Sequence, residues 1–588
     1  MNCVSPAPPP GRTTRSIRRR LATVALLLAG WPLLATAQSP TIRIEGADQA
    51  LTSNIRAHLR IDSERCDVSL RRLDRLLPQV RRNVERAAQA LGYYHLEQSL
   101  QFSTGEECWE LVVDVTPGEP VIVDTVEILI PEELRPLFRD ARQNTSIRPG
   151  STLNHGAYER LKTNLTTAAI ENGFFDARFN RSQLNIDATA NTAEIILDFE
   201  PGERYRFGEV EIGETEALSE EFIGRFVPFE QDEPYSAAQL ATLRENLNGS
   251  QYFQQVTVAP QLSRASNRRV PVAIAMTPRV RRSYTAGAGI STDAGPRLRL
   301  AYEDRYINRQ GHRLNADLTL STQRQEPSVS YIIPLENPAR DSLRLSGGFQ
   351  REEADSYSAN AYRVGISHRH TYDNNWSQTV FTNFQHERAV VAGSQEQTNT
   401  TVSGVNWSRT RADDPIYPQR GWRLFGQISG ANKALLSDTT FLQLHTSAKY
   451  IRPLGSGRLL LRGEVASTVV DETAQLPVSE RFFTGGDQSV RGHAWNSLGA
   501  RDDEGNVVGG KNLLVTSVEF DFPVWENWNA AVFYDAGNSF NDFGTMTLRD
   551  SAGVGIRWLS PIGSIRADIA RTLDDGSFRF HLTMGPDL

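Results

Sequence analysis

The chain has 588 residues, too many for one ordinary domain, and several domains are therefore expected. The formal net charge of −7 is spread along the sequence and no basic face stands out, so nucleic acid is not an expected partner. After the N-terminal segment, no stretch approaches the ~18 consecutive apolar residues of a membrane-spanning helix, which leaves a secreted soluble protein or a membrane β-barrel.

Residues 1–37 are typical of a signal peptide. Arginines between Arg12 and Arg20 form a basic region, the apolar run Leu21–Leu34 follows, and Ala35-Thr36-Ala37 is an A-x-A cleavage site. A membrane anchor is the alternative, but the apolar run is shorter than the ~20 residues that a spanning helix needs. The sequence therefore predicts an exported chain.

Removal of this segment takes Cys3 with it and leaves Cys66 and Cys108. Exported compartments are oxidising, so a disulfide between these two cysteines is expected. The two residues have no CxxC spacing and no histidine cluster beside them, which argues against a catalytic or metal-binding role.

Residues 41–278 contain a threefold repeat of about 80 residues. Each unit has an aromatic pair at the end of its second helix, and the pairs lie 81 and 78 positions apart: Tyr93-Tyr94, Phe174-Phe175 and Tyr252-Phe253. The second helices are expected over residues 70–91, 158–170 and 237–247, with Gly92 and Gly173 ending the first two. Opening strands are expected at residues 41–45, 121–130 and 207–212, and closing strands in the second unit at residues 174–180 and 193–199. The predicted order is β-α-α-β-β, three times.

The size, the element order and the helix-ending glycine with its aromatic pair resemble POTRA domains. The resemblance implies three α+β domains, at residues 38–118, 119–202 and 203–279. Such domains bind other chains by adding a strand to a sheet edge. A role as simple spacers is the alternative.

Residues 280–588 change to period-two patterns. Segments such as residues 314–320 and 565–569 alternate apolar with polar residues, as a wall between lipid and a wet lumen does, with Arg566 and Asp568 facing inward. About sixteen antiparallel strands fit, with short and long connections alternating, so a membrane β-barrel is expected. A soluble β-sandwich array is the alternative, but its strands would bury both faces of a core.

The longest connection, residues 471–511, carries the segment Val490, Arg491, Gly492, His493. A later strand contains a Phe-x-Asp-x-Gly segment with Phe533, Asp535 and Gly537. This combination resembles the outer-membrane assembly-factor superfamily of the BamA and TamA type. The resemblance implies that the loop folds into the lumen and that Arg491 binds Asp535, since a guanidinium inside a barrel needs a carboxylate. His493 stands where the family usually has tyrosine.

Three POTRA units and this chain length resemble the TamA branch of the superfamily, the translocation and assembly module. The resemblance implies insertion or secretion of outer-membrane proteins such as autotransporters, with the POTRA arm in the periplasm and a TamB-like, inner-membrane-anchored partner. Clients would enter through a seam between the first and last barrel strands, near Gly287, Gly289, Phe578 and Phe580. A lipid-transfer endpoint, which delivers phospholipid to the outer membrane, is a second hypothesis, and a passive porin is a third.

No enzyme motif was found among the chemistry-bearing residues. The ten histidines are scattered, and neither HExxH nor G-x-S-x-G occurs. We therefore expect a protein that is not an enzyme and that needs no cofactor or metal.

Overall fold

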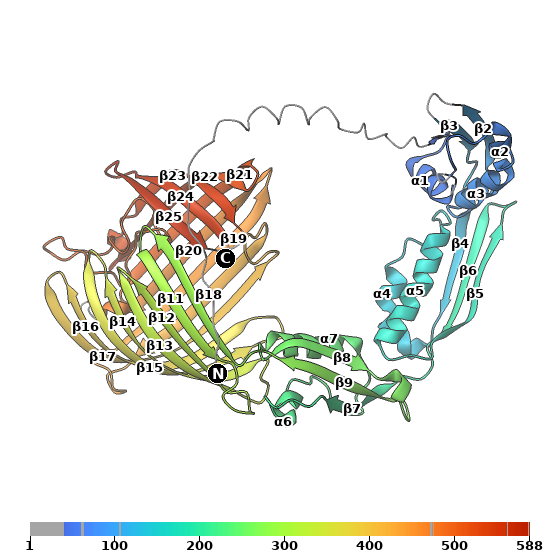
Figure 1. Ribbon diagram of the computed structural model, residues 1–588. Coiled ribbons are helices and arrows are strands. Elements are labelled where there is room, and N and C mark those ends of the chain that lie inside the picture. Colours follow the sequence, from blue (N-terminus) through green and yellow to red (C-terminus); the bar gives the residue numbers. More distant parts are fainter. Residues whose placement is uncertain are drawn as a thin grey trace, which may run out of the picture. The chain divides into compact units, whose positions relative to one another are not determined.

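The computed structural model describes residues 40–585 and 587, except residues 60, 62, 63, 105–107, 471, 472, 474, 475, 561 and 562 (Figure 1). The predicted signal peptide lies outside the described residues. The chain divides into two compact units, Met1–Arg204 and Tyr205–Leu588. The first holds two small α+β domains, and the second holds a third such domain with a large barrel. The predicted domain limits within these units stay predictions.

The first domain is a three-stranded sheet with helices packed on it. β1 (Thr41–Glu45) runs parallel to β3 (Trp109–Thr116), and β2 (Glu97–Thr104) pairs with β3 in the antiparallel sense. The last strand is therefore the central one, and it alternates buried and exposed residues as a strand packed on one face does. The helices are α1 (Gln49–His58), α2 (Leu70–Asp74) and α3 (Leu77–Gln89).

The single helix expected over residues 70–91 is divided in two. α2 ends at Asp74 and α3 starts at Leu77, with Pro78 in its first turn, where a missing N–H costs nothing. The apolar stripe that predicted the helix is buried in the core at Leu73, Val80, Val84, Ala87 and Ala88. Proline therefore restarts the helix without removing its apolar face from the core.

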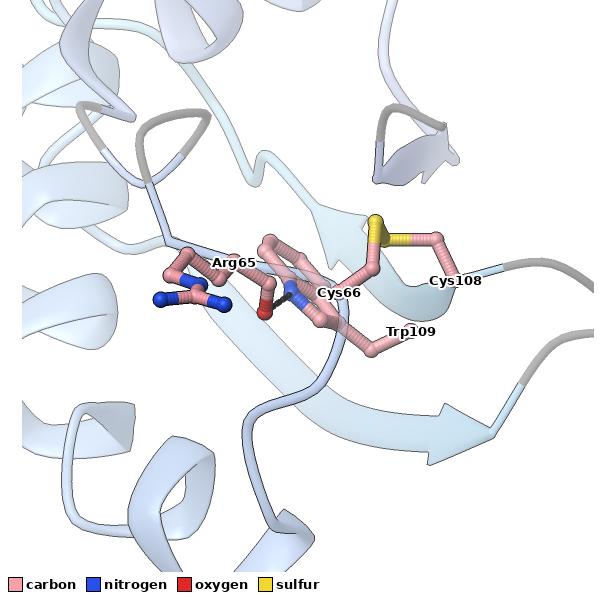
Figure 2. The surroundings of a disulfide bond; sticks show 4 residues. All are labelled: Arg65, Cys66, Cys108 and Trp109. Atoms are coloured by element: carbon pink, nitrogen blue, oxygen red, sulfur yellow. Dashed lines mark hydrogen bonds between the residues drawn. A yellow bond between two sulfur atoms is a disulfide. The ribbon is translucent and has the colours of Figure 1, made fainter. Parts of the chain in front are cut away.

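A disulfide joins Cys66 to Cys108 in this domain (Figure 2). It ties the segment between α1 and α2 to the residue before β3. The adjacent Trp109 is 2% exposed, and its indole Nε1 donates a hydrogen bond to the Arg65 carbonyl at 3.3 Å. The disulfide therefore fixes the segment before α2 to the sheet of this domain.

The second and third domains repeat this architecture. The second contains β4 (Ile122–Leu129), η1 (Glu132–Phe138), α4 (Arg139–Gln143), α5 (His155–Glu171), β5 (Arg178–Asp187) and β6 (Thr192–Glu200). The third contains β7 (Arg206–Ile212), α6 (Glu220–Gly224), α7 (Ala237–Gly249), β8 (Phe253–Pro260), η2 (Leu262–Arg264) and β9 (Arg269–Pro278). Their sheets have the orders β4-β6-β5 and β7-β9-β8, which again place the last strand in the centre. The repeat predicted from the aromatic pairs is confirmed.

The predicted start of one strand was wrong. Residues 174–180 were expected to be extended, but β5 begins only at Arg178. Phe174 instead turns into the core of the second domain, where it is 1% exposed and lies against Phe138. The chain reaches this position through Gly173, whose φ of +85° continues the turn after α5.

The first aromatic pair lies where the first and second domains meet. The Gly92 carbonyl accepts a hydrogen bond from the Val121 amide at 2.8 Å, and a Cβ at Gly92 would lie 2.6 Å from the Leu153 carbonyl oxygen. The Tyr94 hydroxyl lies 2.8 Å from His155 Nε2. Burial lowers the pKa of His155, which favours a neutral imidazole in this contact. The glycine and the aromatic pair thus form a joint between domains.

The third pair forms the corresponding joint with the barrel. The Tyr252 hydroxyl donates a hydrogen bond of 2.6 Å to the Gly311 carbonyl in the turn after the second barrel strand. Burial raises the pKa of Tyr252 to about 12, so the phenol keeps the proton that it donates. A Cβ at Gly311 would lie 2.3 Å from the Phe222 ring, so only glycine allows this approach. The third domain is therefore docked on the turn that follows the second barrel strand.

The barrel consists of sixteen antiparallel strands, each paired with its neighbours along the chain (Figure 1). They are β10 (Arg282–Ser291), β11 (Gly295–Asp304), β12 (Arg313–Ser321), β13 (Arg324–Pro334), β14 (Asp341–Glu353), β15 (Tyr357–Thr371), β16 (Ser377–Val391), β17 (Ser394–Ala412), β18 (Gly421–Ala431), β19 (Phe441–Leu454), β20 (Gly457–Val469), β21 (Asn512–Trp525), β22 (Trp528–Phe540), β23 (Arg549–Ser560), β24 (Gly563–Thr572) and β25 (Phe578–Gly585). The predicted strand number and the predicted long connection between the eleventh and twelfth strands are confirmed.

The barrel wall has an apolar outer face and a polar inner face. On β24, Ile569 faces outward and is 52% exposed, whereas the inward Asp568 is 4% exposed. The outward positions of β25, Phe578 and Phe580, are likewise exposed. Among the described residues, no helix has the length and apolar character needed to cross a membrane. An apolar outside around a polar inside is the pattern of a barrel surrounded by lipid.

The joint between the third domain and the barrel is tested by Tyr252→Phe. Loss of the hydroxyl leaves the Gly311 carbonyl without its donor and should cost about 1 kcal/mol. Tryptic cleavage in residues 305–312 should accelerate by about fivefold, because cleavage follows the population of the opened turn. The matched variant Tyr94→Phe removes the hydroxyl at the first joint and should leave this turn unchanged. Equal cleavage in Tyr252→Phe and the native chain would contradict the proposed contact.

The disulfide is tested by reduction. Its loop has a sequence separation of 42 residues. Closing a loop of that size stabilises a domain by up to about 4 kcal/mol in the chain-entropy account. Proteolysis across a urea series should show residues 64–104 becoming cleavable at lower urea after reduction, while residues 206–278 of the third domain do not shift. Unchanged cleavage in both segments would show that the disulfide does not stabilise the first domain.

Candidate functional site

The long connection between β20 and β21 lies against the inner wall of the barrel, and we call residues 476–511 the lumen loop. Its two arms pair with each other: the Phe482 and Gly510 backbones exchange hydrogen bonds of 2.8 and 2.9 Å, and those of Thr484 and Leu498 exchange two of 2.9 Å. The short helix η4 (Val478–Glu480) is held by Glu387 of β16, which accepts hydrogen bonds from the Val478 and Ser479 amides. The loop is thus ordered by its own backbone pairs and by the wall.

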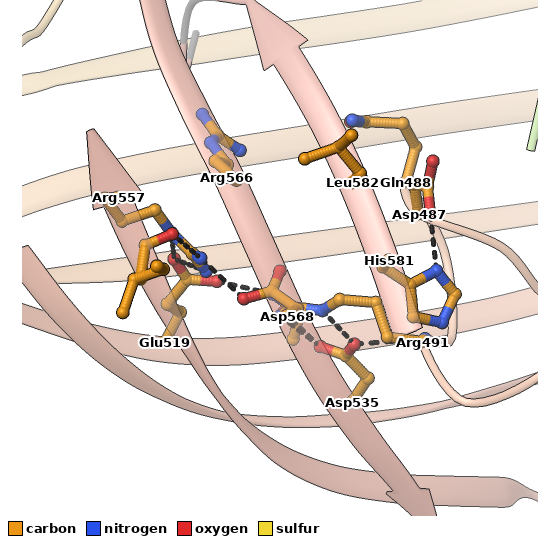
Figure 3. Close-up of polar contacts among 12 residues, drawn as sticks. Asp487, Gln488, Arg491, Glu519, Asp535, Arg557, Arg566, Asp568, His581 and Leu582 are labelled. Atoms are coloured by element: carbon orange, nitrogen blue, oxygen red, sulfur yellow. Dashed lines mark hydrogen bonds and ion pairs between the residues drawn. The ribbon is translucent and has the colours of Figure 1, made fainter. Parts of the chain in front are cut away.

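Arg491 is the main anchor of the lumen loop (Figure 3). Its Nε and Nη2 donate to the two carboxylate oxygens of Asp535 at 2.7 and 2.9 Å, a bidentate pair. Its Nη1 donates to Glu519 at 2.7 Å and to Asp568 at 3.2 Å. Arg491 is 6% exposed and Asp535 is 0% exposed. The predicted partner of Arg491 is therefore in place, together with two further carboxylates from β21 and β24.

All three named residues of the Phe-x-Asp-x-Gly segment of β22 contribute to the surroundings of Arg491. The Arg491 guanidinium carbon lies 3.4 Å from the centroid of the Phe533 ring, a cation–π contact. Asp535 supplies the ion pair, and Gly537 leaves room for β21, since a Cβ there would lie 2.8 Å from the Leu514 carbonyl oxygen. The Phe533 ring in turn needs Gly553 on β23, where a Cβ would lie 2.3 Å from it. The four strands β21 to β24 thus all contribute residues that accommodate the Arg491 side chain or its partners.

A second arginine completes the cluster. Arg557 of β23 is 1% exposed and donates to Glu519 at 2.8 Å and to Asp568 at 2.5 Å. Two arginines and three carboxylates therefore share a network in which every member has a partner of opposite charge. Such a network is costly to break, because removal of one member leaves buried charge without compensation.

The residues around Arg491 fix the loop backbone. Val490 is fully buried, and Arg462 of β20 donates to the carbonyls of Gln488 and Ser489. Gly492 has a φ of +98°, and a Cβ there would lie 3.2 Å from both Ser551 and Thr572. Its amide donates to His581 Nε2 of β25 at 2.9 Å. A glycine at this position is therefore required by both its backbone angle and its surroundings.

His493 occupies the position at which the sequence departs from the family. Its backbone carbonyl accepts a hydrogen bond from the Gly486 amide at 3.2 Å, and its ring is half-buried. Among the described residues, His493 Nε2 is buried and has no hydrogen-bond partner. His493 is thus tied to the loop by its backbone carbonyl.

The four residues expected at the seam lie on its two strands. Gly287 and Gly289 are on β10, and Phe578 and Phe580 are on β25 with their side chains on the outer face. A Cβ at Gly287 would meet nothing within 4 Å, so its small size is not required by packing. A Cβ at Gly289 would lie 3.1 Å from the Arg297 side chain, and the weakening effect of the two glycines on the strand stays a prediction.

Glu519, Arg557, Asp487 and His581 were missed as site residues in the sequence. Each is a charged or polar residue at an inward position of the barrel or in its loop, and period-two alternation alone marks Glu519 and Arg557 as inward. Their partners lie 11 to 195 positions away, as in Arg557 with Asp568 and Asp487 with Thr292. Such pairs follow from strand register, which no local pattern fixed.

The Arg491 network predicts strong coupling between its members. Arg491→Ala leaves the buried Asp535 without its cation and leaves Glu519 and Asp568 with Arg557 alone, and breaking a buried pair costs about 3 to 5 kcal/mol. Asp535→Asn should cost less, because Glu519 and Asp568 remain. Unfolding of the barrel in detergent should show that the double variant is little worse than Arg491→Ala alone. Additive effects would show that the two residues act independently.

Two sequence families match the chain. The Omp85 superfamily domain matches residues 307–587, and the POTRA domain described as TamA domain 1 matches residues 41–117. BamA, an outer membrane protein assembly factor, of Neisseria meningitidis serogroup B is 22% identical over 517 residues, which cover 73% of this chain and 63% of that protein. BamA of Nitratidesulfovibrio vulgaris is 24% identical over 379 residues, 60% of this chain and 47% of that protein. The chain thus spans less than two thirds of the length of these two relatives.

A solved structure shares the fold. The crystal structure of BamA from Haemophilus ducreyi lacking POTRA domains 1–3 superposes with a TM-score of 0.62 at 16% identity, covering 79% of this chain and 99% of that one. A barrel with a lumen loop, the Phe-x-Asp-x-Gly strand and POTRA domains agree with both sequence matches. The chain belongs to the Omp85 superfamily and is similar in sequence to proteins of the BamA type.

Proposed function

We propose that this chain is the outer-membrane component of a translocation and assembly module that inserts or secretes outer-membrane proteins, autotransporters among them. The clients would enter through the seam between β10 and β25. The observation that carries this proposal is a free strand edge on β10.

β10 is fully paired with β11 on one side, from Arg282 opposite Asp304 to Ser291 opposite Gly295. On the other side, β10 and β25 form no continuous ladder among the described residues. Hydrogen bonds cross the seam just beyond β10, where the Thr292 amide donates to the Leu582 carbonyl at 3.2 Å. Continued from that pair, the antiparallel register would place Gly289 opposite Gly585, the last residue of β25. Residues 282–288 then have no strand opposite them.

A free edge of this kind presents unpaired N–H and C=O groups to an incoming strand. A client strand could add to residues 282–288 by main-chain hydrogen bonds, which do not depend on the client's side chains. This independence suits a protein that handles many different clients.

The end of β25 is directed away from β10. Asp587, beyond Gly585, lies inside the barrel, where its carboxylate binds Arg458 Nη1 at 3.0 Å and its backbone carbonyl accepts from Lys449 Nζ at 3.2 Å. Arg566 also pairs with this carboxylate. These contacts hold the chain after β25 against β19, β20 and β24, and so support a seam that stays open beside residues 282–288.

The POTRA domains would lie in the periplasm and bind a TamB-like partner anchored in the inner membrane. Each three-stranded sheet has its last strand in the centre and therefore keeps two edge strands, one of which a partner strand can extend. The docked third domain would bring such a partner close to the turn between β11 and β12. We also propose that the chain acts without catalysis, since the lumen cluster consists of mutually paired charges.

Delivery of phospholipid to the outer membrane is a second candidate function, which one observation favours. An apolar hollow of about 800 Å³ lies on the outer face beside the seam, lined by Tyr284, Leu300, Tyr302, Leu318, Val329 and Phe349. Small residues at Ala286, Ala316 and Gly347 leave this space. The hollow has the size and polarity of a site for an acyl chain.

The free edge is tested by crosslinking to a stalled client with a cysteine in its last strand. Ser283→Cys lies on the free edge of β10, whereas the control Ser330→Cys lies on β13, which is paired on both sides with Asn315 and Ser346. The native Cys66–Cys108 disulfide leaves both of these cysteines oxidised. Ser283→Cys should capture the client and Ser330→Cys should not. Equal capture at the two positions would refute entry along β10.

The two candidate functions are separated in a deletion strain. Protein insertion predicts loss of autotransporter surface display with the lipid distribution intact. Lipid delivery predicts altered outer-membrane lipid asymmetry before any display defect, and substitution of Ala316 by Phe, which fills the hollow, should reproduce it.

A further inference from the structure

The seam has a closed end and an open end. Its closed end lies at the turn after β10, where the Thr292 amide and the Leu582 carbonyl are hydrogen-bonded and the Leu582 amide donates to Thr292 Oγ1 at 3.2 Å. We call this the far end of the seam, since β10 begins beside the third POTRA domain and reaches Thr292 last. The free residues 282–288 lie toward the other end.

One residue of the lumen loop, Asp487, contacts both sides of the far end, and Figure 3 shows its contact with His581 of β25. Asp487 Oδ1 accepts hydrogen bonds from Thr292 Oγ1 at 2.9 Å and from His581 Nδ1 of β25 at 2.5 Å. The Asp487 amide donates to Asp293 Oδ2 at 2.5 Å. The Asp487 side chain is 4% exposed, so its carboxylate depends on these donors in place of water.

The tautomer of His581 follows from its neighbours. The Gly492 amide donates to Nε2 at 2.9 Å, and a backbone N–H can only donate, so Nε2 carries the lone pair. The hydrogen is therefore on Nδ1 and is donated to Asp487. Asp293, Asp487 and His581 lie close enough to surround a cation, but a protonated Nδ1 has no lone pair for one. The cluster is thus a hydrogen-bond network across the seam.

The loop backbone is shaped for this contact. Gly486, the residue before Asp487, has a φ of +100°, which favours glycine. A Cβ at Gly486 would lie 2.4 Å from Asp293 Oδ2, so a larger residue would push the loop away from the turn. The atom approached is the Asp293 oxygen that accepts from the Asp487 amide, so the backbone at Gly486 and this hydrogen bond fit together.

We propose that Asp487 is a positioning residue that clasps the far end of the seam. Arg491 fixes the lumen loop to β21, β22 and β24, and Asp487, four residues earlier, extends that fixed point to β25 and to the turn after β10. Full opening of the seam then requires release of Asp487 from Thr292 and His581, while the Arg491 network stays intact. Use of the clasp as a gate for clients rests on the proposed function, whereas the clasp itself does not.

The clasp is tested by amide hydrogen exchange in the purified full-length protein, without client. Asp487→Ala should accelerate exchange of the segments that contain Thr292 and Leu582 by about fivefold or more, the change that loss of one net hydrogen bond produces. Thr292→Val removes the hydroxyl from the other side and should act in the same direction. The matched control Asp503→Ala changes an exposed aspartate of the same loop and should leave this exchange unchanged.

Exchange of β22 and β24, which hold the Arg491 network, separates a clasp from general loosening. Faster exchange at the far end with β22 and β24 unchanged supports the proposal. Native exchange in both Asp487→Ala and Thr292→Val overturns it, as does equal acceleration in β22 and β24 or in Asp503→Ala. Failure of Ser283→Cys to capture a client would instead refute the proposed function and would leave this result untouched.

Discussion

The structure of the barrel depends on one constraint: the buried guanidinium of Arg491 needs carboxylates beside it. Arg491 stands in a loop inside the barrel, where water is largely replaced by protein, and a guanidinium there is stable only beside carboxylates. Asp535, Glu519 and Asp568 supply them from three different strands. Because these strands must be in register for the carboxylates to meet, the arginine links the position of the loop to the assembly of the wall.

This constraint has consequences at the seam. With the loop fixed on β21, β22 and β24, Asp487 reaches the turn after β10 and His581 of β25, and the far end is held closed. Among the described residues, no such contact joins β10 and β25 at the opposite end, where Asp587 is bound by Arg458 and Lys449. One barrel thus combines a restrained end with a strand edge on β10 that is available for pairing. The proposed function would use both features, because the barrel would have to expose an edge to a client while its own wall persists.

The sequence predicted those features whose cause is local. The aromatic pairs with their helix-ending glycines predicted three domains, and the structure explains the motif, because Gly92 and Tyr252 form the joints to the next domain or to the barrel. Period-two alternation predicted the strands and the inward direction of Arg566 and Asp568. The combination of Arg491 with Phe533 and Asp535 was recognised by resemblance. Phe174-Phe175 was misjudged as the start of a strand, because aromatic residues favour strands and core turns alike.

Features that depend on register could not be predicted in this way. Glu519, Arg557, Asp487 and His581 meet their partners only after neighbouring strands have paired, and a shift by one residue would turn each inward side chain outward.

The most direct test of the account is amide hydrogen exchange of β10 in the intact protein. The account predicts that the amides of residues 282–288 that point to the seam, those of every second residue, exchange much faster than the amides of β11 and β12, while the Thr292 region is protected. Uniform protection along β10 would show that its edge is paired, and would contradict the account.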